Sequence, residues 1–280
     1  MVRLCQVNGA AIHVKSTARM GFALVEESLY RVHATMEDKH WWFVARRKII
    51  TDVARKLSQN VQQPFIVDIG CGTGGSLAHF KQEKFQCVGI DSSQIAIDLA
   101  SEKFPECDFR CGRMPDDLRD ISSKVTLFTL LDVLEHVEDD KKFLSDLVHL
   151  APKGADILIT VPALKSLWSP HDVANHHFRR YEKPELEAVW NGLPVTCRMT
   201  GFFNARLYPI ISMMRSIANL KKSSAGEGGS DFSMPMSPIN KALTSIFASE
   251  SRRIVDQIDN VASSHFKTGT SLRAVLRKEE

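Results

Sequence analysis

The sequence has no strong excess of one charge, no long apolar segment near its start and no paired cysteines. Its 36 Lys and Arg residues and 33 Asp and Glu residues give a formal net charge of +3, and the basic residues are scattered. Nucleic-acid-binding proteins usually gather basic residues in a patch, so we expect no nucleic-acid partner. The opening stretch MVRLCQVNGAAIHVKS lacks the unbroken apolar core of a signal peptide, which predicts a cytoplasmic protein.

The cysteines form no CxxC pair and are too sparse for a disulfide scaffold, so reduced thiols are expected. There are six: Cys5, Cys71, Cys87, Cys107, Cys111 and Cys197. The sequence also lacks the HExxH and Cys/His spacings of zinc sites, and we therefore predict no metal. No internal repeat is visible, and KKSSAGEGGSD (221–231) is predicted to be a mobile loop.

Apolar runs alternate with helix-compatible segments along most of the chain. The chain has 280 residues with 44% hydrophobic content, enough to bury a full core. The predicted strands are FIVDIG (65–70), QCVGID (86–91), CDFRCGR (107–113), VTLFTLLDV (125–133) and ADILITVPA (155–163). This alternation predicts an α/β fold with a doubly wound, mainly parallel sheet.

Three regions are expected around this sheet. Residues 1–60 would form an N-terminal helical cap or lid, residues 61–202 and 266–280 the core, and residues 203–265 a helical insertion before the last strand. The insertion contains an apolar stretch (202–220) that Arg206, Pro209 and Arg215 make a poor membrane span. A substrate lid, a homodimer contact and a helix lying on a membrane surface all remain open for it.

A glycine-rich loop, VDIGCGTGGSL (67–77), follows the first predicted strand and opens a helix, where doubly wound folds bind nucleotides. Gly70, Gly72 and Gly75 also satisfy the GxGxxG pattern of dinucleotide enzymes. The Asp68 carboxylate would oppose an anionic pyrophosphate but suits S-adenosyl-L-methionine, whose ammonium and sulfonium are cationic. Asp91 ends the next strand, where a carboxylate can accept both ribose hydroxyls.

With these residues the sequence resembles the class I S-adenosylmethionine-dependent methyltransferases, in particular the small-molecule, ubiquinone-type O-methyltransferases. The resemblance rests on VDIGCGTGG, VGIDSS and TLLDVLEHVEDD (129–140), covers about residues 40–200 and the last strand, and implies a seven-stranded Rossmann-like sheet. The sequence departs from the family at Arg113, where many members carry an acidic residue near the adenine. The cofactor contacts that we expect are Trp42, Arg46, Asp68, Gly70, Cys71, Gly72, Asp91, Ser92, Gly112, Arg113, Met114, Leu131 and Asp132.

A dense polar cluster, LWSPHDVANHHFRRYEKPEL (167–186), follows the fifth predicted strand. It therefore lies at the sheet edge that carries the glycine loop, where the acceptor would bind. Helical spacing over 172–181 would place Asp172, His176 and Arg180 on one face. Metal binding by its histidines and a purely structural Asp–Arg pair are the other interpretations. The candidate bases are His136, His176 and His177, and the candidate acceptor-binding residues are His171, Arg179, Arg180 and Tyr181.

The predicted function is methyl transfer from S-adenosyl-L-methionine to an oxygen of a small-molecule, glycan or lipid-linked acceptor. MEDKHWWFVARRKII (36–50) and SPHDVANHHFRRY (169–181) resemble a bacterial methyltransferase subgroup found among enzymes of glycan, lipid or secondary-metabolite assembly. Methyl transfer to nitrogen is the alternative reaction. An NAD-dependent oxidoreductase and a non-catalytic cofactor-binding protein are the alternatives from other classes.

Overall fold

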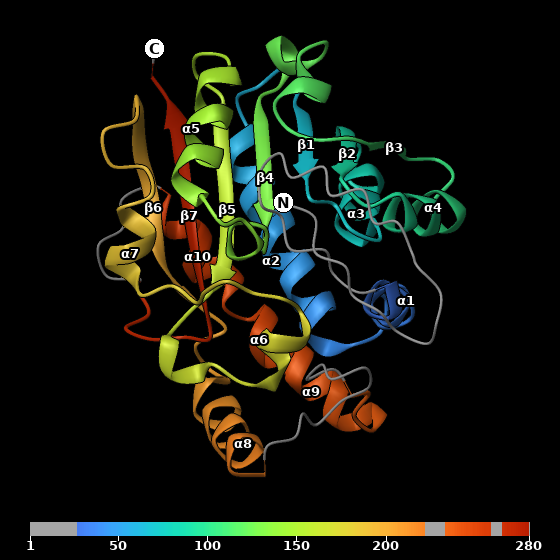
Figure 1. The fold of residues 1–280 in the computed structure, drawn as a ribbon, viewed down its shortest axis with the longest axis vertical. Helices are drawn as coiled ribbons and strands as arrows, with labels where there is room; N and C mark the ends of the chain where they lie inside the picture. Colours follow the sequence, from blue (N-terminus) through green and yellow to red (C-terminus); the bar gives the residue numbers. More distant parts are fainter. Residues whose placement is uncertain (1–26, 222–232, 259–264, 280) are drawn as a thin grey trace, which may run out of the picture.

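The computed structural model of the protein describes residues 27–221, 233–258 and 265–279 (Figure 1). The expected N-terminal cap lies partly outside these residues, and the loop predicted at 221–231 lies almost wholly outside them. Within the described part, the helices and strands follow the alternation expected from the sequence.

Seven strands form one sheet in the order β3-β2-β1-β4-β5-β7-β6. The strands are β1 (Phe65–Ile69), β2 (Gln86–Asp91), β3 (Asp108–Cys111), β4 (Leu127–Leu131), β5 (Asp156–Pro162), β6 (Val195–Phe203) and β7 (Ser271–Lys278). Pairings from β3 to β5 are parallel, and β7 runs antiparallel to both of its neighbours, β5 and β6. The predicted doubly wound, mainly parallel sheet is confirmed.

Helices precede the first strand, cross between strands and fill the segment before the last strand. They are α1 (Glu27–Met36), α2 (Trp41–Ser58), α3 (Gly75–Gln82), α4 (Gln94–Lys103), α5 (Asp140–Leu150), α6 (Pro170–Ala174), α7 (Lys183–Glu187), α8 (Tyr208–Lys221), α9 (Ser237–Ala248) and α10 (Ser251–Gln257), with short 3-10 turns such as η3 (Leu134–His136) and η4 (Lys165–Leu167). Figure 1 shows α6, α8 and α9 beyond the carboxyl ends of β1, β4 and β5. None of the described helices is both long and apolar enough to cross a membrane.

The central strands are apolar on both faces because helices cover both faces of the sheet. Successive side chains of a strand point to opposite sides, so Phe128 packs into one apolar cluster with α5 while Leu127 packs into another with α2 and α3. In α5, the apolar residues at helical spacing are buried as predicted: Phe143, Leu144, Leu147 and Val148.

The polar cluster after β5 is not the continuous helix considered from its spacing. Helix α6 starts at a capping box formed by Ser169 and Asp172 and ends at Ala174. His176 then adopts a left-handed backbone conformation with φ of 54°, which no helix can continue through. A short turn of helix and a bend therefore replace the single helical face.

The packing of α5 gives a direct test of the core. Leu147 is fully buried between α5 and the sheet, so Leu147→Ala should lower the free energy of unfolding by about 2–5 kcal/mol through lost burial and an unfilled cavity. The exposed Lys141 of the same helix serves as the control, and Lys141→Ala should change the free energy of unfolding by less than about 0.5 kcal/mol. Urea denaturation of both variants measures the difference, and equal effects would contradict this packing.

Candidate functional site

A cavity of about 1000 Å³ opens at the carboxyl ends of the parallel strands. Open α/β sheets bind ligands at this edge because loops diverge there and leave a crevice. All of the cofactor contacts expected from the sequence line the cavity: Trp42, Arg46, Asp68, Gly70, Cys71, Gly72, Asp91, Ser92, Gly112, Arg113, Met114, Leu131 and Asp132. Residues from five separate segments are thus brought to one place.

The glycine loop has a backbone that only glycine adopts easily. Gly70 and Gly72 have φ values of 71° and 54°, in the left-handed region. A Cβ atom on Gly70 would also lie 2.7 Å from Cγ2 of Val133, in the turn after β4. Gly70 therefore packs closely against the turn after β4, and the absence of side chains on Gly70 and Gly72 lets a ligand approach the loop backbone closely.

Two buried carboxylates lie beside this loop. The Asp91 carboxylate accepts hydrogen bonds from the backbone N–H groups of Gly72 (3.0 Å) and Ser93 (2.8 Å), which fixes it at the end of β2. Asp68 is 1% exposed and accepts a 2.6 Å hydrogen bond from the Thr129 hydroxyl. Burial raises the pKa of Asp68 to about 7, although the Thr129 bond opposes this shift.

The N-terminus of α3 is occupied by the protein's own anion. The Glu37 carboxylate accepts hydrogen bonds from the Thr73 hydroxyl (2.9 Å) and the Gly75 backbone N–H (3.1 Å), and Lys103 pairs with it at 2.7 Å. In dinucleotide-binding folds this helix terminus receives the pyrophosphate. A dinucleotide bound in the same way would place its phosphates against Glu37, so the site disfavours such a ligand.

Arg46 of α2 crosses the floor of the cavity. Its Nη2 atom lies 2.7 Å from the Asp132 carboxylate and donates to the Thr160 hydroxyl at 2.8 Å, and its guanidinium lies 5.0 Å from the centre of the Trp42 ring. Its Nε atom is buried and has no hydrogen-bond partner within the part of the chain that the structure describes. Arg46 thus lines the cavity with its guanidinium paired to Asp132 and Thr160, and its contact with a ligand stays a prediction.

These groups fit S-adenosylmethionine. The carboxylates of Asp68 and Asp132 suit its ammonium and sulfonium, and Asp91 suits its ribose hydroxyls. The glycine loop leaves room for a close approach of the ligand to the backbone. The carboxyl groups of Glu37, Asp68 and Asp91 gather around the glycine loop, which is the opposite of what a pyrophosphate requires.

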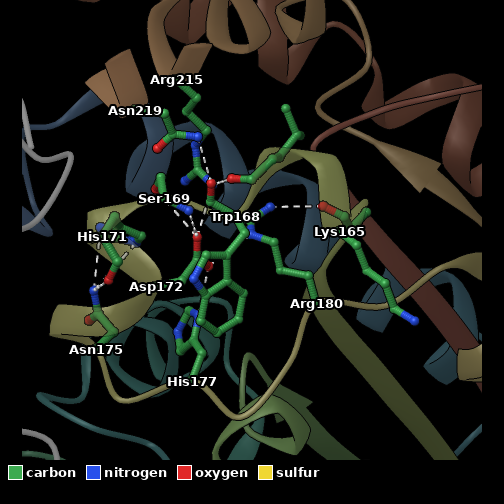
Figure 2. Close-up of polar contacts among 12 residues, drawn as sticks. Lys165, Trp168, Ser169, His171, Asp172, Asn175, His177, Arg180, Arg215 and Asn219 are labelled. Carbon is green, nitrogen blue, oxygen red and sulfur yellow. Dashed lines mark hydrogen bonds and ion pairs between the residues drawn. The ribbon is translucent and has the colours of Figure 1, made fainter. Parts of the chain in front are cut away.

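The acceptor end of the cavity is organised around Asp172, which is 0% exposed. Figure 2 shows His177, Arg180 and Arg215 converging on its carboxylate, at 2.9 Å, 2.8 Å and 3.5 Å. Burial alone would raise the pKa of Asp172, but the His177 hydrogen bond and the charges of Arg180 and Arg215 outweigh it and lower the pKa below its usual range. Asp172 is therefore an anion throughout the neutral pH range.

Two imidazoles and a carboxyl group converge next to this anion. Nδ1 of His177 lies 2.9 Å from the Asp172 carboxylate, and the ring centroid of His177 lies 4.7 Å from that of His136. In a neutral imidazole that donates from Nδ1, Nε2 is the acceptor. Glu135 is 1% exposed, and neither oxygen has a hydrogen-bond partner within the described ranges. Burial raises the pKa of Glu135 well above its ordinary value and lowers that of His136 to about 3, so both are neutral near pH 7.

Glu135, His136 and His177 are also the group that could hold a metal ion, because their ligand atoms lie within 4.8 Å of one another. None of the metal patterns weighed from the sequence combined these three residues. The absence of a metal stays a prediction.

Not every residue proposed for the acceptor side reaches the cavity. His136, His177, His171 and Arg180 line it. His176 is exposed and is not among the lining residues, because its left-handed backbone turns it away from its neighbour. The structure thus gives no support to His176 as the base.

Arg179 and Tyr181 also lie outside the cavity lining. Arg179 pairs with Asp140 at 2.8 Å, and the Tyr181 hydroxyl donates to the same carboxylate at 2.7 Å. Both side chains brace the loop against the start of α5. The structure thus shows them in contact with α5, and their assignment to acceptor binding stays a prediction that these contacts do not support.

The sequence interpretation overlooked several lining residues. Tyr30, Glu37, Asn175, Asn204 and Arg215 all face the cavity. Arg215, one of two arginines in the apolar stretch 202–220, was the one visible signal, because a charge there needs a buried partner. The others come from segments distant in sequence and carry no local pattern.

The comparisons with known proteins agree with this geometry. Residues 41–193 match the family model described as "Methyltransferase domain". The chain is 30% identical over 138 residues to norajmaline N-methyltransferase of Rauvolfia serpentina, covering 47% of this chain and 46% of that protein. It is 27% identical over 116 residues to the ubiquinone biosynthesis O-methyltransferase of Rickettsia conorii, covering 40% of each. The chain thus spans less than half the length of these two relatives.

Among solved structures, the plantazolicin methyltransferase BpumL in complex with SAH has a TM-score of 0.52 and 18% identity, covering 90% of this chain and 88% of that one. This similarity supports the fold. The predictions of a class I methyltransferase and of S-adenosyl-L-methionine as its cofactor are confirmed. Because the family model covers more than half of the sequence, the chain belongs to the methyltransferase domain family.

Proposed function

We propose that this protein transfers the methyl group of S-adenosyl-L-methionine to an oxygen of a small-molecule, glycan or lipid-linked acceptor. One observation carries the proposal: the same cavity is lined by the glycine loop and Asp91 at one end and by His136 and His177 at the other. A methyl donor and a hydroxyl acceptor can therefore meet in one enclosed space.

Bound S-adenosyl-L-methionine supplies an electrophilic methyl group on a sulfonium that is already a good leaving group. The residues of the chain align the acceptor and remove its proton. As the acceptor oxygen receives the methyl group, His177 would take the hydroxyl proton on Nε2. Asp172 accepts from Nδ1 of His177, which fixes the tautomer and stabilises the imidazolium that forms.

Oxygen is preferred to nitrogen because of this Asp172–His177 pair. A neutral amine can attack a methyl sulfonium before it loses a proton, whereas an alcohol or phenol gains more from a base. Transfer to nitrogen, the reaction named for the Rauvolfia relative, is the second candidate. The acidic cavity wall and the position of Glu37 disfavour a dinucleotide oxidoreductase.

Calorimetry of the full chain tests cofactor choice without knowledge of the acceptor. We expect S-adenosyl-L-methionine to bind with a micromolar dissociation constant, because Asp68 and Asp132 complement its positive charges. NADH should give no heat of binding at the same concentrations. Tight binding of NADH with none of S-adenosyl-L-methionine would overturn the proposal in favour of an oxidoreductase.

The pKa of Asp68 makes cofactor binding dependent on pH. A cationic ligand prefers the ionised carboxylate, so protonation of Asp68 below its pKa of about 7 should weaken binding. The ligand's amino group has an ordinary pKa of about 7.7–8.0 and stays protonated in this range. Affinity should therefore rise roughly tenfold between about pH 5.5 and pH 7.

Asp68→Asn should weaken binding and remove this pH dependence. Asp98→Asn, a change at an exposed acid on α4, is the matched control and should keep it. Calorimetric titrations of the three proteins at several pH values provide the measurement. A pH dependence that persists in the Asp68 variant would rule out this origin.

Alanine substitutions at the adjacent residues His176 and His177 test which histidine acts as the base. His177→Ala should slow methyl transfer by about 10²–10⁴-fold, because the proton loses its acceptor. His176→Ala should leave the rate near that of the wild type, because His176 is exposed and outside the cavity lining. The assay follows label from methyl-tritiated S-adenosyl-L-methionine into hydroxylated acceptors of a solvent-extracted lipid fraction. Comparable rates for the two variants, with cofactor binding retained, would refute His177 as the base.

A further inference from the structure

The exposed large hydrophobic side chains of the described residues gather at one end of the molecule. All of them belong to three segments, 173–178, 210–217 and 234–246: Val173, Phe178, Ile210, Met213, Met214, Ile217, Met234, Met236, Ile239 and Ile246. These segments contain α6, α8, α9 and their flanking residues, which Figure 1 shows together beyond the carboxyl ends of the strands. A concentration of apolar surface at one end marks a place of contact.

This apolar surface is continuous with the cavity. Ile210, Met214 and Ile217 of α8 line the cavity although each is 44–54% exposed, and Ile239 of α9 does the same at 47%. These side chains thus contact both the cavity and the solvent. An acceptor that enters here meets apolar side chains before it reaches His177.

The charged residues of α8, of α9 and of the few residues before each of these helices are all basic. The segments 204–221 and 233–248 contain no Asp or Glu. Within them, Arg206 and Lys241 are exposed. Two copies meeting through this face would bring like charges together, whereas an anionic surface would neutralise them.

Helix α8 is held to the acceptor loop by its polar side chains. Arg215 donates to the backbone carbonyl of Leu167 at 2.8 Å as well as to Asp172, and Asn219 donates to the carbonyl of Trp168 at 2.8 Å (Figure 2). Met213 is 59% exposed on the same helix and does not line the cavity. Arg215 and Asn219 thus hold α8 to the loop after β5, while Met213 on the same helix is left facing the solvent.

We propose that this end of the molecule, formed by α6, α8 and α9 and hereafter the apolar rim, docks on the surface of a lipid bilayer that contains anionic lipid. The methyl acceptor is then an amphiphile of that bilayer: its hydroxyl group enters toward His177 while its hydrocarbon part lies along α8 and α9. Amphipathic helices with exposed Met and Ile and basic neighbours lie in such interfaces. The acceptor class rests on the proposed methyl transfer, whereas the docking does not.

Vesicle co-sedimentation of the full chain tests the docking. The wild type should sediment with phosphatidylcholine vesicles that contain phosphatidylglycerol, and less with phosphatidylcholine alone or at high salt. The double variant Met213→Glu with Met236→Glu changes two exposed side chains that do not line the cavity, and its vesicle partition coefficient should fall about tenfold or more. The double variant Gln62→Glu with Gln63→Glu adds the same charge at exposed positions just before β1, at the opposite end of the sheet, and should bind like the wild type.

Calorimetry with S-adenosyl-L-methionine separates this proposal from the proposed function. Each variant should keep wild-type cofactor affinity, which also shows that it folds. Cofactor binding and methyl transfer without vesicle binding would overturn the docking and leave the methyltransferase proposal intact. Light scattering that shows a wild-type dimer, which the apolar-rim variant dissociates, would also overturn it and assign this face to a second copy. Equal loss of vesicle binding in both double variants would show a general charge effect and would likewise reject the apolar rim as the docking surface.

Discussion

The buried carboxylate of Asp172 is the constraint on which the acceptor half of this protein depends. A charge without solvent access is stable only when neighbouring groups compensate it. Here the compensation comes from His177 and Arg180 in the loop after β5 and from Arg215 in α8. The Asp172 carboxylate therefore links the loop after β5, the candidate base His177 and helix α8, and it helps to position all three.

Glu37 has a comparable role at the cofactor end. It anchors the end of α1 to the start of α3 and fills the position that would otherwise attract a phosphate. With Asp68 and Asp91, it makes this part of the cavity acidic, and an acidic wall selects a cationic ligand. The same pattern of glycines that serves dinucleotides elsewhere is thus restricted to a different cofactor by a residue that lies outside the glycine loop.

The two ends of the cavity differ in the surface they present to the outside. The cofactor end is lined by the glycine loop and by acids such as Asp91, while the acceptor end opens between apolar side chains of α8 and α9 such as Met214 and Ile239. A donor with several charges and an acceptor with a hydrocarbon part would therefore enter chemically distinct regions. This arrangement links the proposed reaction to the proposed membrane surface.

The sequence by itself determined the sheet and brought the expected cofactor contacts to one edge of it, because both depend on local patterns. Strands such as Phe65–Ile69 are buried on both faces and show as apolar runs, and residues at their carboxyl ends, such as Asp68 and Asp91, must meet at one edge. Only the tertiary structure decided the acceptor side. Whether His176 or His177 enters the cavity depends on a left-handed residue and on Arg215, 43 positions beyond Asp172. Side-chain direction in an irregular loop is set by such distant partners, and no periodicity in the sequence records them.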